Sequence, residues 1–107
     1  MTENTAREDM LEKLAESFGP EYAEQLLASM ETEIRKLLGV FEAAYKAENL
    51  EDMHQSSHDL CSVSGTIGFT RLATHAKAVE KACDARDFDA IERHYKALLD
   101  VAGQDLP

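Results

Sequence analysis

The chain of 107 residues has no tryptophan, two cysteines, two prolines and five glycines, and it contains no long hydrophobic run. So few cysteines exclude a disulfide framework, and Cys61 and Cys83 are typical of reduced cytosolic thiols. No stretch reaches the roughly 18 apolar residues that a membrane-spanning helix needs, and the first residues lack the basic and apolar regions of a signal peptide. We therefore expect a cytoplasmic protein with no membrane partner.

Positive charge is also scarce, with 11 lysines and arginines against 21 acidic residues and no basic run. A surface that binds nucleic acid has to neutralise phosphates, so we expect no nucleic-acid partner. No glycine-rich phosphate loop precedes a lysine, so we expect no ATP site and no autonomous kinase. The length suits one domain over 1–107, with flexible ends at 1–5 and 103–107.

Because glycine and proline are few, apolar residues recur three and four positions apart along most of the chain, which is the period of a helix. The stripes and their boundaries predict five helices, at 6–18, 20–48, 50–66, 72–86 and from 88 onward. Pro20 suits the first turn of the second helix. Asn49 and Asp87 suit the N-caps of the third and fifth.

Short connections between long helices favour antiparallel neighbours. The expected fold is therefore all-α, an antiparallel up-down-up-down four-helix bundle with the short first helix packed at one end. Since a single chain supplies all four long helices, we expect a monomer.

The third predicted helix has a face without long charged side chains. From His58, the positions three, four and seven residues on are Cys61, Ser62 and Gly65, which share its face and are all small. Leu60 points toward the core, which leaves the His58 ring at the edge of the apolar stripe, within reach of solvent. A flat surface around a protruding nucleophile suits the docking of a second protein.

The run from His58 to Gly68, HDLCSVSGTIG, resembles the phospho-acceptor motif of histidine-containing phosphotransfer (Hpt) domains, H-x-L-K-G-S-S-x-x-x-G. It keeps the histidine, Leu60, Ser64 and Gly68. The chain length, the five predicted helices and a Val-Glu pair ending at Glu80 are also similar to that family. The resemblance thus covers essentially the whole chain, and it assigns structural roles to Leu60, Ser64 and Gly68.

The resemblance implies that His58 accepts a phosphoryl group from a receiver-domain aspartate and passes it to another receiver, downstream of a sensor or hybrid histidine kinase. Neutral imidazole is a good nucleophile near physiological pH, and its phosphoramidate is labile. The chain itself would need no cofactor, because Mg²⁺ is expected on the receiver. Glu80 is expected to orient the imidazole. The expected docking residues are Gln55, Cys61, Ser62 and Gly65.

This sequence departs from the motif at two positions, because Cys61 and Ser62 stand where the family usually has lysine and glycine. A phosphohistidine carries nearly two negative charges, which an adjacent ammonium group would stabilise. Lys77 lies three residues before Glu80 on one helical face. We therefore expect Lys77 to be the substitute phosphate stabiliser.

Two alternatives stay open. The domain could bind a receiver without accepting phosphate, or the third helix could hold a metal ion through His54, His58, Cys61 and Glu51. Four ligands on one straight helix cannot close a tetrahedron, so the next helix would have to add Cys83 or His75. We consider the metal site less favoured than phosphotransfer and predict no metal-binding residues. The spacing leaves open what Cys61 does to phosphotransfer, and whether Cys61 or Cys83 has a redox role.

Overall fold

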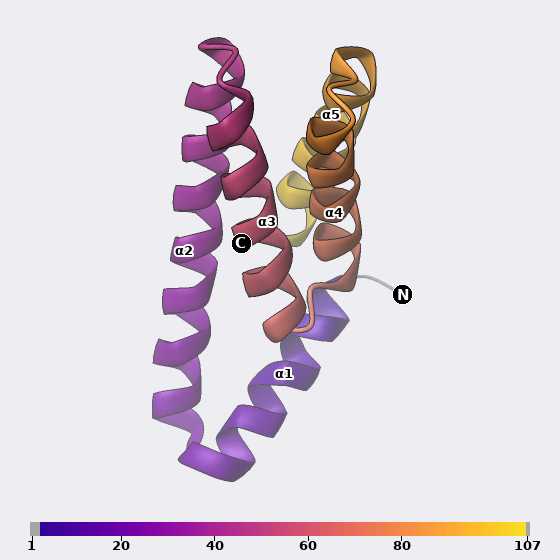
Figure 1. The fold of residues 1–107 in the computed structure, drawn as a ribbon. Helices are drawn as coiled ribbons and strands as arrows, with labels where there is room; N and C mark the ends of the chain where they lie inside the picture. Colours follow the sequence, from indigo (N-terminus) through magenta and orange to yellow (C-terminus); the bar gives the residue numbers. More distant parts are fainter. Residues whose placement is uncertain (1–2, 107) are drawn as a thin grey trace.

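The helical period of the sequence is realised as five α-helices. The computed structural model describes residues 3–106, with side chains from Arg7 onward, and shows no strand among them. The helices are α1 (Glu3–Phe18), α2 (Pro20–Lys46), α3 (Leu50–Thr66), α4 (Thr70–Asp84) and α5 (Phe88–Asp105) (Figure 1). The all-α class is confirmed, and each boundary lies within a few residues of the one that the apolar stripes predict.

The predicted helix starts are confirmed by their capping contacts. The side chain of Asn49 accepts a hydrogen bond from the backbone N–H of Asp52 at 3.1 Å. Asp87 accepts one from the N–H of Ala90 at the same distance, and Pro20 occupies the first turn of α2. Each cap satisfies an N–H group that has no partner within its own helix. The caps therefore fix where α3 and α5 begin.

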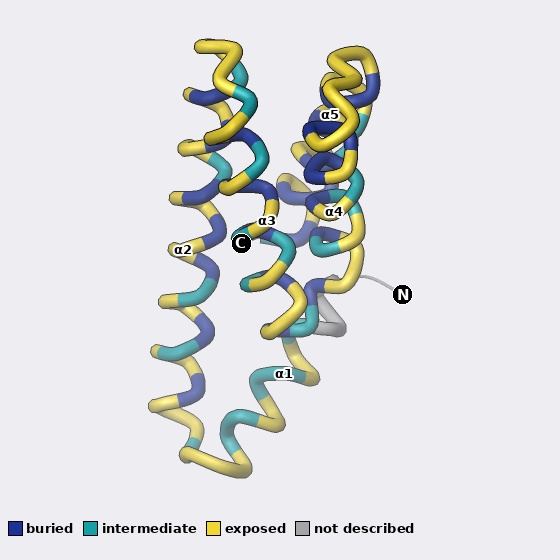
Figure 2. The backbone as a smooth tube through the Cα atoms, in the orientation of Figure 1, coloured by how far each residue is buried: buried dark blue, intermediate teal, exposed yellow. Residues whose placement is uncertain are grey.

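The helices pack mainly against their neighbours in the chain. α3 contacts α2 on one side and α4 on the other, and α4 also contacts α5. The inner faces are buried and the outer faces exposed (Figure 2). The rings of Phe41 on α2 and Tyr95 on α5 meet with centroids 4.7 Å apart and bring α5 against α2. α3 is thus held from both sides, which gives any side chain on its outer face a rigid support.

α1 is fixed to α2 by a buried ion pair. Nε of Arg7 donates to Oε2 of Glu31 at 2.8 Å, and the Glu31 side chain is only 3% exposed. The two helices meet in a turn that extends beyond the ends of α3 and α4 (Figure 1). Phe18 and Tyr22 therefore lie exposed there, with ring centroids 5.5 Å apart, although both continue the apolar spacing of their helices.

The connection from α3 to α4 depends on Gly68. Its φ of +80° lies in the left-handed region that favours glycine. A Cβ added there would lie 3.7 Å from the Met10 side chain of α1. The glycine that closes the histidine motif therefore allows the chain to leave α3 and enter α4 next to α1.

The C-terminal segment 103–107, which the sequence predicts to be flexible, is helical as far as Asp105. Residues 103–105 form the last turn of α5, where the buried Asp105 carboxylate lies 3.6 Å from the Arg71 guanidinium. This contact joins the last turn of α5 to α4. At the other end, α1 begins at Glu3, within the expected flexible segment 1–5. Residues 1–2 and 107 lie outside the described part of the chain. None of the described helices is long and apolar enough to cross a membrane.

Candidate functional site

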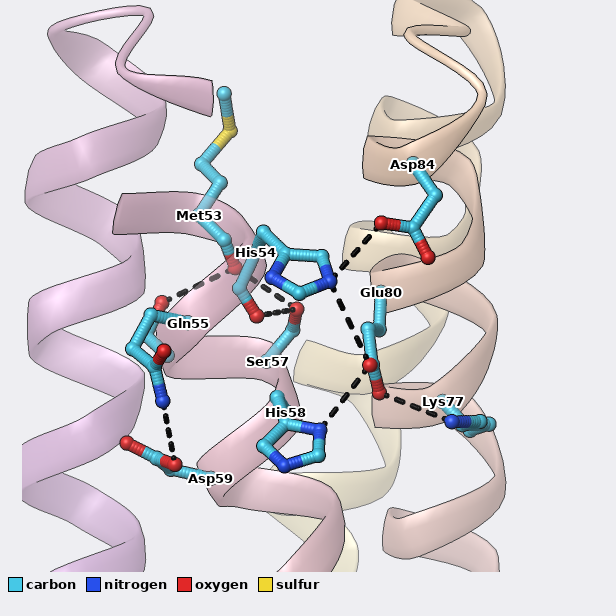
Figure 3. A network of polar contacts seen from close by, with 10 residues as sticks. Met53, His54, Gln55, Ser57, His58, Asp59, Lys77, Glu80 and Asp84 are labelled. Carbon is cyan, nitrogen blue, oxygen red and sulfur yellow. Dashed lines mark hydrogen bonds and ion pairs between the residues drawn. The ribbon is translucent and has the colours of Figure 1, made fainter. Parts of the chain in front are cut away.

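His58 lies on the outer face of α3, and its side chain is 55% exposed. Its Nδ1 atom lies 3.1 Å from Oε2 of Glu80 on α4 (Figure 3). The other ring nitrogen, Nε2, is turned away from that carboxylate. The imidazole is therefore held at one nitrogen by the protein and presents the other at the surface.

Small side chains let α3 pack closely beneath this histidine. Ser56 and Ser57 are both buried, and their hydroxyls donate to carbonyl oxygens one turn earlier on α3, those of Asp52 at 2.7 Å and Met53 at 2.8 Å. Hydroxyls satisfied by their own helix can be buried at little cost. Leu60 and Ser64 of the motif are also buried. The inner face of α3 is thus compact, while His58 lies on the outer face.

Glu80 is the most buried charged group of the site, with a side chain only 9% exposed. Burial alone raises the pKa of its carboxyl, but the hydrogen bonds from His58 and Lys77 outweigh that effect and hold the pKa below its ordinary value. An ionised carboxylate only accepts hydrogen bonds, so the proton must be on Nδ1 of His58. In that tautomer the Nε2 lone pair is free to attack an electrophile.

Lys77 meets the other oxygen of the same carboxylate. Its Nζ lies 3.2 Å from Oε1 of Glu80, and its side chain is about half exposed. The structure thus brings together Lys77, Glu80 and His58. The ammonium group contacts the carboxylate that holds the imidazole, and it helps to keep the pKa of that carboxyl low.

A second histidine, one turn earlier on α3, reaches the same carboxylate. Nε2 of His54 lies 2.9 Å from Oδ1 of Asp84 and 3.6 Å from Oε2 of Glu80. The rings of His54 and His58 are nearly parallel, at 8°, with centroids 6.4 Å apart. Asp84 was not among the site residues predicted from the sequence. Its spacing was a usable signal, because Asp84 follows Glu80 by one helical turn, as His54 precedes His58 by one.

The surface around His58 is open toward α4. Cys61 and Gly65 line a shallow groove of about 530 Å³ together with Lys77 and Lys81 of α4. A Cβ added at Gly65 would meet nothing within 4 Å. The predicted docking residues Cys61 and Gly65 therefore border a free space that begins about one turn along α3 from the histidine.

The other two predicted docking residues are also at the surface. Ser62 is exposed. Gln55 is exposed as well, and its amide donates to Oδ1 of Asp59 at 3.0 Å. Figure 3 shows Gln55 and Asp59 on the α2 side of His58, away from Glu80. The expected docking set thus surrounds the imidazole on two sides.

Comparison with known protein families shows which family the chain belongs to. A family model described as the Hpt domain matches residues 24–103, which is most of the chain. The chain belongs to the Hpt domain family. A search of curated proteins and a search of solved structures each gave no match. The resemblance seen in the sequence is therefore confirmed.

Hpt domains are phosphotransfer carriers of two-component phosphorelays, and they are not autonomous kinases. They interact with response-regulator receiver domains and with histidine kinases. The matched region begins within α2 and ends within α5, so it contains all of α3 and α4. The contacts of His58 and Glu80 described above thus lie inside the Hpt domain.

This Hpt domain departs from the usual motif where Cys61 replaces lysine. Cys61 is half-buried at the edge of the groove and supplies no positive charge. A cation is present nearby on the neighbouring helix, where Lys77 contacts the Glu80 carboxylate.

Proposed function

We propose that this Hpt domain carries a phosphoryl group on His58 between two receiver domains. The contact of Nδ1 with Oε2 of Glu80 at 3.1 Å is the observation that carries the proposal. It supports a fixed tautomer with Nε2 as the nucleophile. The exposure of the ring supports access by a partner protein.

The proposed reaction moves a phosphoryl group from the aspartate of one receiver to His58 and then to the aspartate of another. Nε2 of His58 attacks the phosphorus of a receiver phosphoaspartate, the N–P bond forms, and the acyl phosphate P–O bond breaks to release the aspartate carboxylate. The imidazole becomes positively charged and keeps its Nδ1 proton, which Glu80 accepts in a hydrogen bond. A second receiver reverses these steps when its aspartate carboxylate attacks the phosphorus. Such transfers depend mainly on positioning and charge stabilisation.

Charges on both proteins would stabilise the phosphorylated imidazole. The negative carboxylate of Glu80 stabilises the positive ring, and its low pKa keeps it ionised. Lys77 holds that carboxylate and offers a cation on the α4 side of the site. Mg²⁺ on the receiver is expected to supply the remaining positive charge, so this chain needs no cofactor of its own.

The receiver is proposed to dock over His58 on the surface that includes Gln55, Cys61, Ser62 and Gly65. The groove beside Gly65 supports this placement, because its small side chains let a partner backbone come close. Lys77 and Lys81 border the same groove and would face the acidic aspartate pocket of a receiver. Close approach is needed because the phosphorus must pass directly between the two acceptor atoms.

We further propose that α2–α5 form an antiparallel up-down-up-down bundle with α1 at one end. The pairing of His58 with Glu80 and of His54 with Asp84 supports opposite directions for α3 and α4. Four long helices from one chain favour a monomer. Free cysteines favour a cytoplasmic location, and the acidic composition argues against nucleic-acid or membrane partners.

Cys61 in place of the usual lysine favours one second candidate, a receiver-binding module without phosphotransfer. The deciding experiment incubates the chain with a phosphorylated receiver and then adds an unphosphorylated one. We expect acid-labile label on the wild-type chain and on His54→Gln, no label on His58→Gln, and movement of the label to the second receiver. A folded wild-type chain that binds the receiver but takes no label would establish the binding module and overturn the carrier.

A further inference from the structure

We propose that His54, Glu80 and Asp84 form a binding site for one divalent transition-metal ion of the Zn²⁺ type. Each residue offers one ligand atom, and the three atoms lie within 4.8 Å of one another. Phosphotransfer from His58 uses neither His54 nor Asp84. The site is therefore a second function of the surface between α3 and α4.

The distances from His54 to the two carboxylates suit direct coordination, and the two carboxylate oxygens lie within 4.8 Å of each other, so a small movement brings all three atoms onto one ion. Nε2 of His54 lies 2.9 Å from Oδ1 of Asp84 and 3.6 Å from Oε2 of Glu80. An ion about 2.1 Å from each atom would see these pairs at roughly 90° and 120°, close to the angles of tetrahedral and five-coordinate zinc. Small side-chain movements complete the geometry, and Asp84 is free to make them because its side chain is 63% exposed.

The two helices supply the ligands in a favourable pattern. Glu80 and Asp84 are four residues apart, so both carboxylates lie on one face of α4. His54 reaches them from α3, which resolves the difficulty of closing a metal site with ligands from a single helix. The second helix contributes these two carboxylates in place of Cys83 or His75. Cys83 is buried in the core and lies outside the group of three ligand atoms.

The chemistry of the ligands selects the class of ion. One imidazole nitrogen with two carboxylate oxygens suits Zn²⁺ and similar first-row ions, whereas Mg²⁺ prefers an octahedral shell of oxygen atoms. Two negative carboxylates next to a neutral histidine also balance the charge of a divalent cation. A hollow of about 230 Å³ lined by His54 and Asp84 opens beside the site and has room for water as a further ligand.

The site meets the phosphotransfer site at a single atom. Oε2 of Glu80 faces both His54 and His58. A carboxylate oxygen has two lone pairs, so it can bind an ion and still accept the Nδ1 proton of His58. Removal of the His58 ring abolishes the phospho-acceptor but leaves all three metal ligands in place, which separates this proposal from the carrier function.

The test is titration calorimetry with Zn²⁺ at neutral pH, with Mg²⁺ as a comparison ion and circular dichroism to verify the fold. We expect one Zn²⁺ per wild-type chain and little or no binding of Mg²⁺. His54→Gln and Asp84→Asn should each weaken Zn²⁺ binding by about tenfold or more. His94→Gln, which removes a histidine from α5, should change the affinity by less than about twofold. His58→Gln removes only a hydrogen bond to a ligand carboxylate and should weaken binding less than His54→Gln does.

Three results would overturn the site. The first is that wild-type protein binds no Zn²⁺ at equimolar ratio, and the second is that folded His54→Gln keeps the wild-type affinity. In the third, His58→Gln would lose as much affinity as His54→Gln, which would move the ion to the phospho-acceptor.

Discussion

Nδ1 of His58 on α3 lies 3.1 Å from Oε2 of Glu80 on α4, and this contact defines the chemistry of the surface. It connects the two helices that carry the site. It also assigns different roles to the two nitrogens of one ring, since the buried carboxylate takes Nδ1–H and leaves Nε2 exposed. A histidine without such a partner could expose either nitrogen.

Removal of the Glu80 carboxylate should slow phosphorylation without unfolding the protein. Glu80→Ala loses a charge-assisted hydrogen bond, so we expect the rate at His58 to fall by about ten- to a hundredfold. Glu80→Gln keeps an acceptor oxygen for Nδ1–H and should fall between the wild type and alanine. Glu92→Ala on α5 is the matched control. Rates that are equal in the wild type and folded Glu80→Ala would remove the orienting role.

Lys77→Ala should have a smaller effect than loss of Glu80. The ammonium group is half-exposed, and exposed ion pairs contribute about 1 kcal/mol or less. We expect phosphorylation to slow, and the lifetime of phosphohistidine to shorten, by about two- to fivefold. Lys81→Ala, one turn further along the same groove, tests whether general positive charge is enough. If Lys77→Ala leaves both rate and lifetime unchanged, Lys77 is no phosphate stabiliser.

A bulky residue in the groove should block transfer while the fold survives. Cβ atoms added at Gly65 on α3 and at Gly39 on α2 would each meet nothing within 4 Å, so both helices accept a side chain there. We expect Gly65→Arg to reduce transfer from a phosphorylated receiver by about tenfold or more, with an unchanged circular dichroism spectrum. Gly39→Arg should transfer at the wild-type rate. Normal transfer by Gly65→Arg would place the docking surface elsewhere.

The two thiols should react differently in the folded protein. Burial raises the pKa of Cys83 to about 11, so about one molecule in a thousand carries this thiolate at pH 8. Cys61 is half-buried beside the groove. With an aromatic disulfide reagent we expect one fast thiol, absent from Cys61→Ser, and a second that reacts only on unfolding. Fast reaction of both thiols in the native protein would contradict the buried state of Cys83.

Much of this fold follows from local patterns in the sequence. The apolar spacing locates the helices because each helix has to bury one face. Asn49 and Asp87 mark helix starts because their side chains satisfy N–H groups of the first turn. Both signals involve residues a few positions apart, which is why they can be read without a structure.

Contacts between distant residues were harder to foresee. The spacing indicated that Lys77 and Glu80 share one face of α4, and their contact lies within that helix. The pairing of His58 with Glu80 depends instead on the relative rotation of α3 and α4, which the spacing does not determine. The pairing of His54 with Asp84 depends on the same rotation. The buried ion pair of Arg7 with Glu31 depends on where α1 packs, which helix propensity does not determine.

The most direct test is to identify the phosphorylated atom. The wild-type chain, labelled with ¹⁵N at histidine, would be phosphorylated by phosphoramidate or by a receiver and examined by ¹⁵N and ³¹P NMR. We predict one phosphoryl group on Nε2 of His58, with Nδ1 still protonated and bonded to Glu80. Phosphate on Nδ1 of His58, or on His54, would contradict the central role of the His58–Glu80 contact.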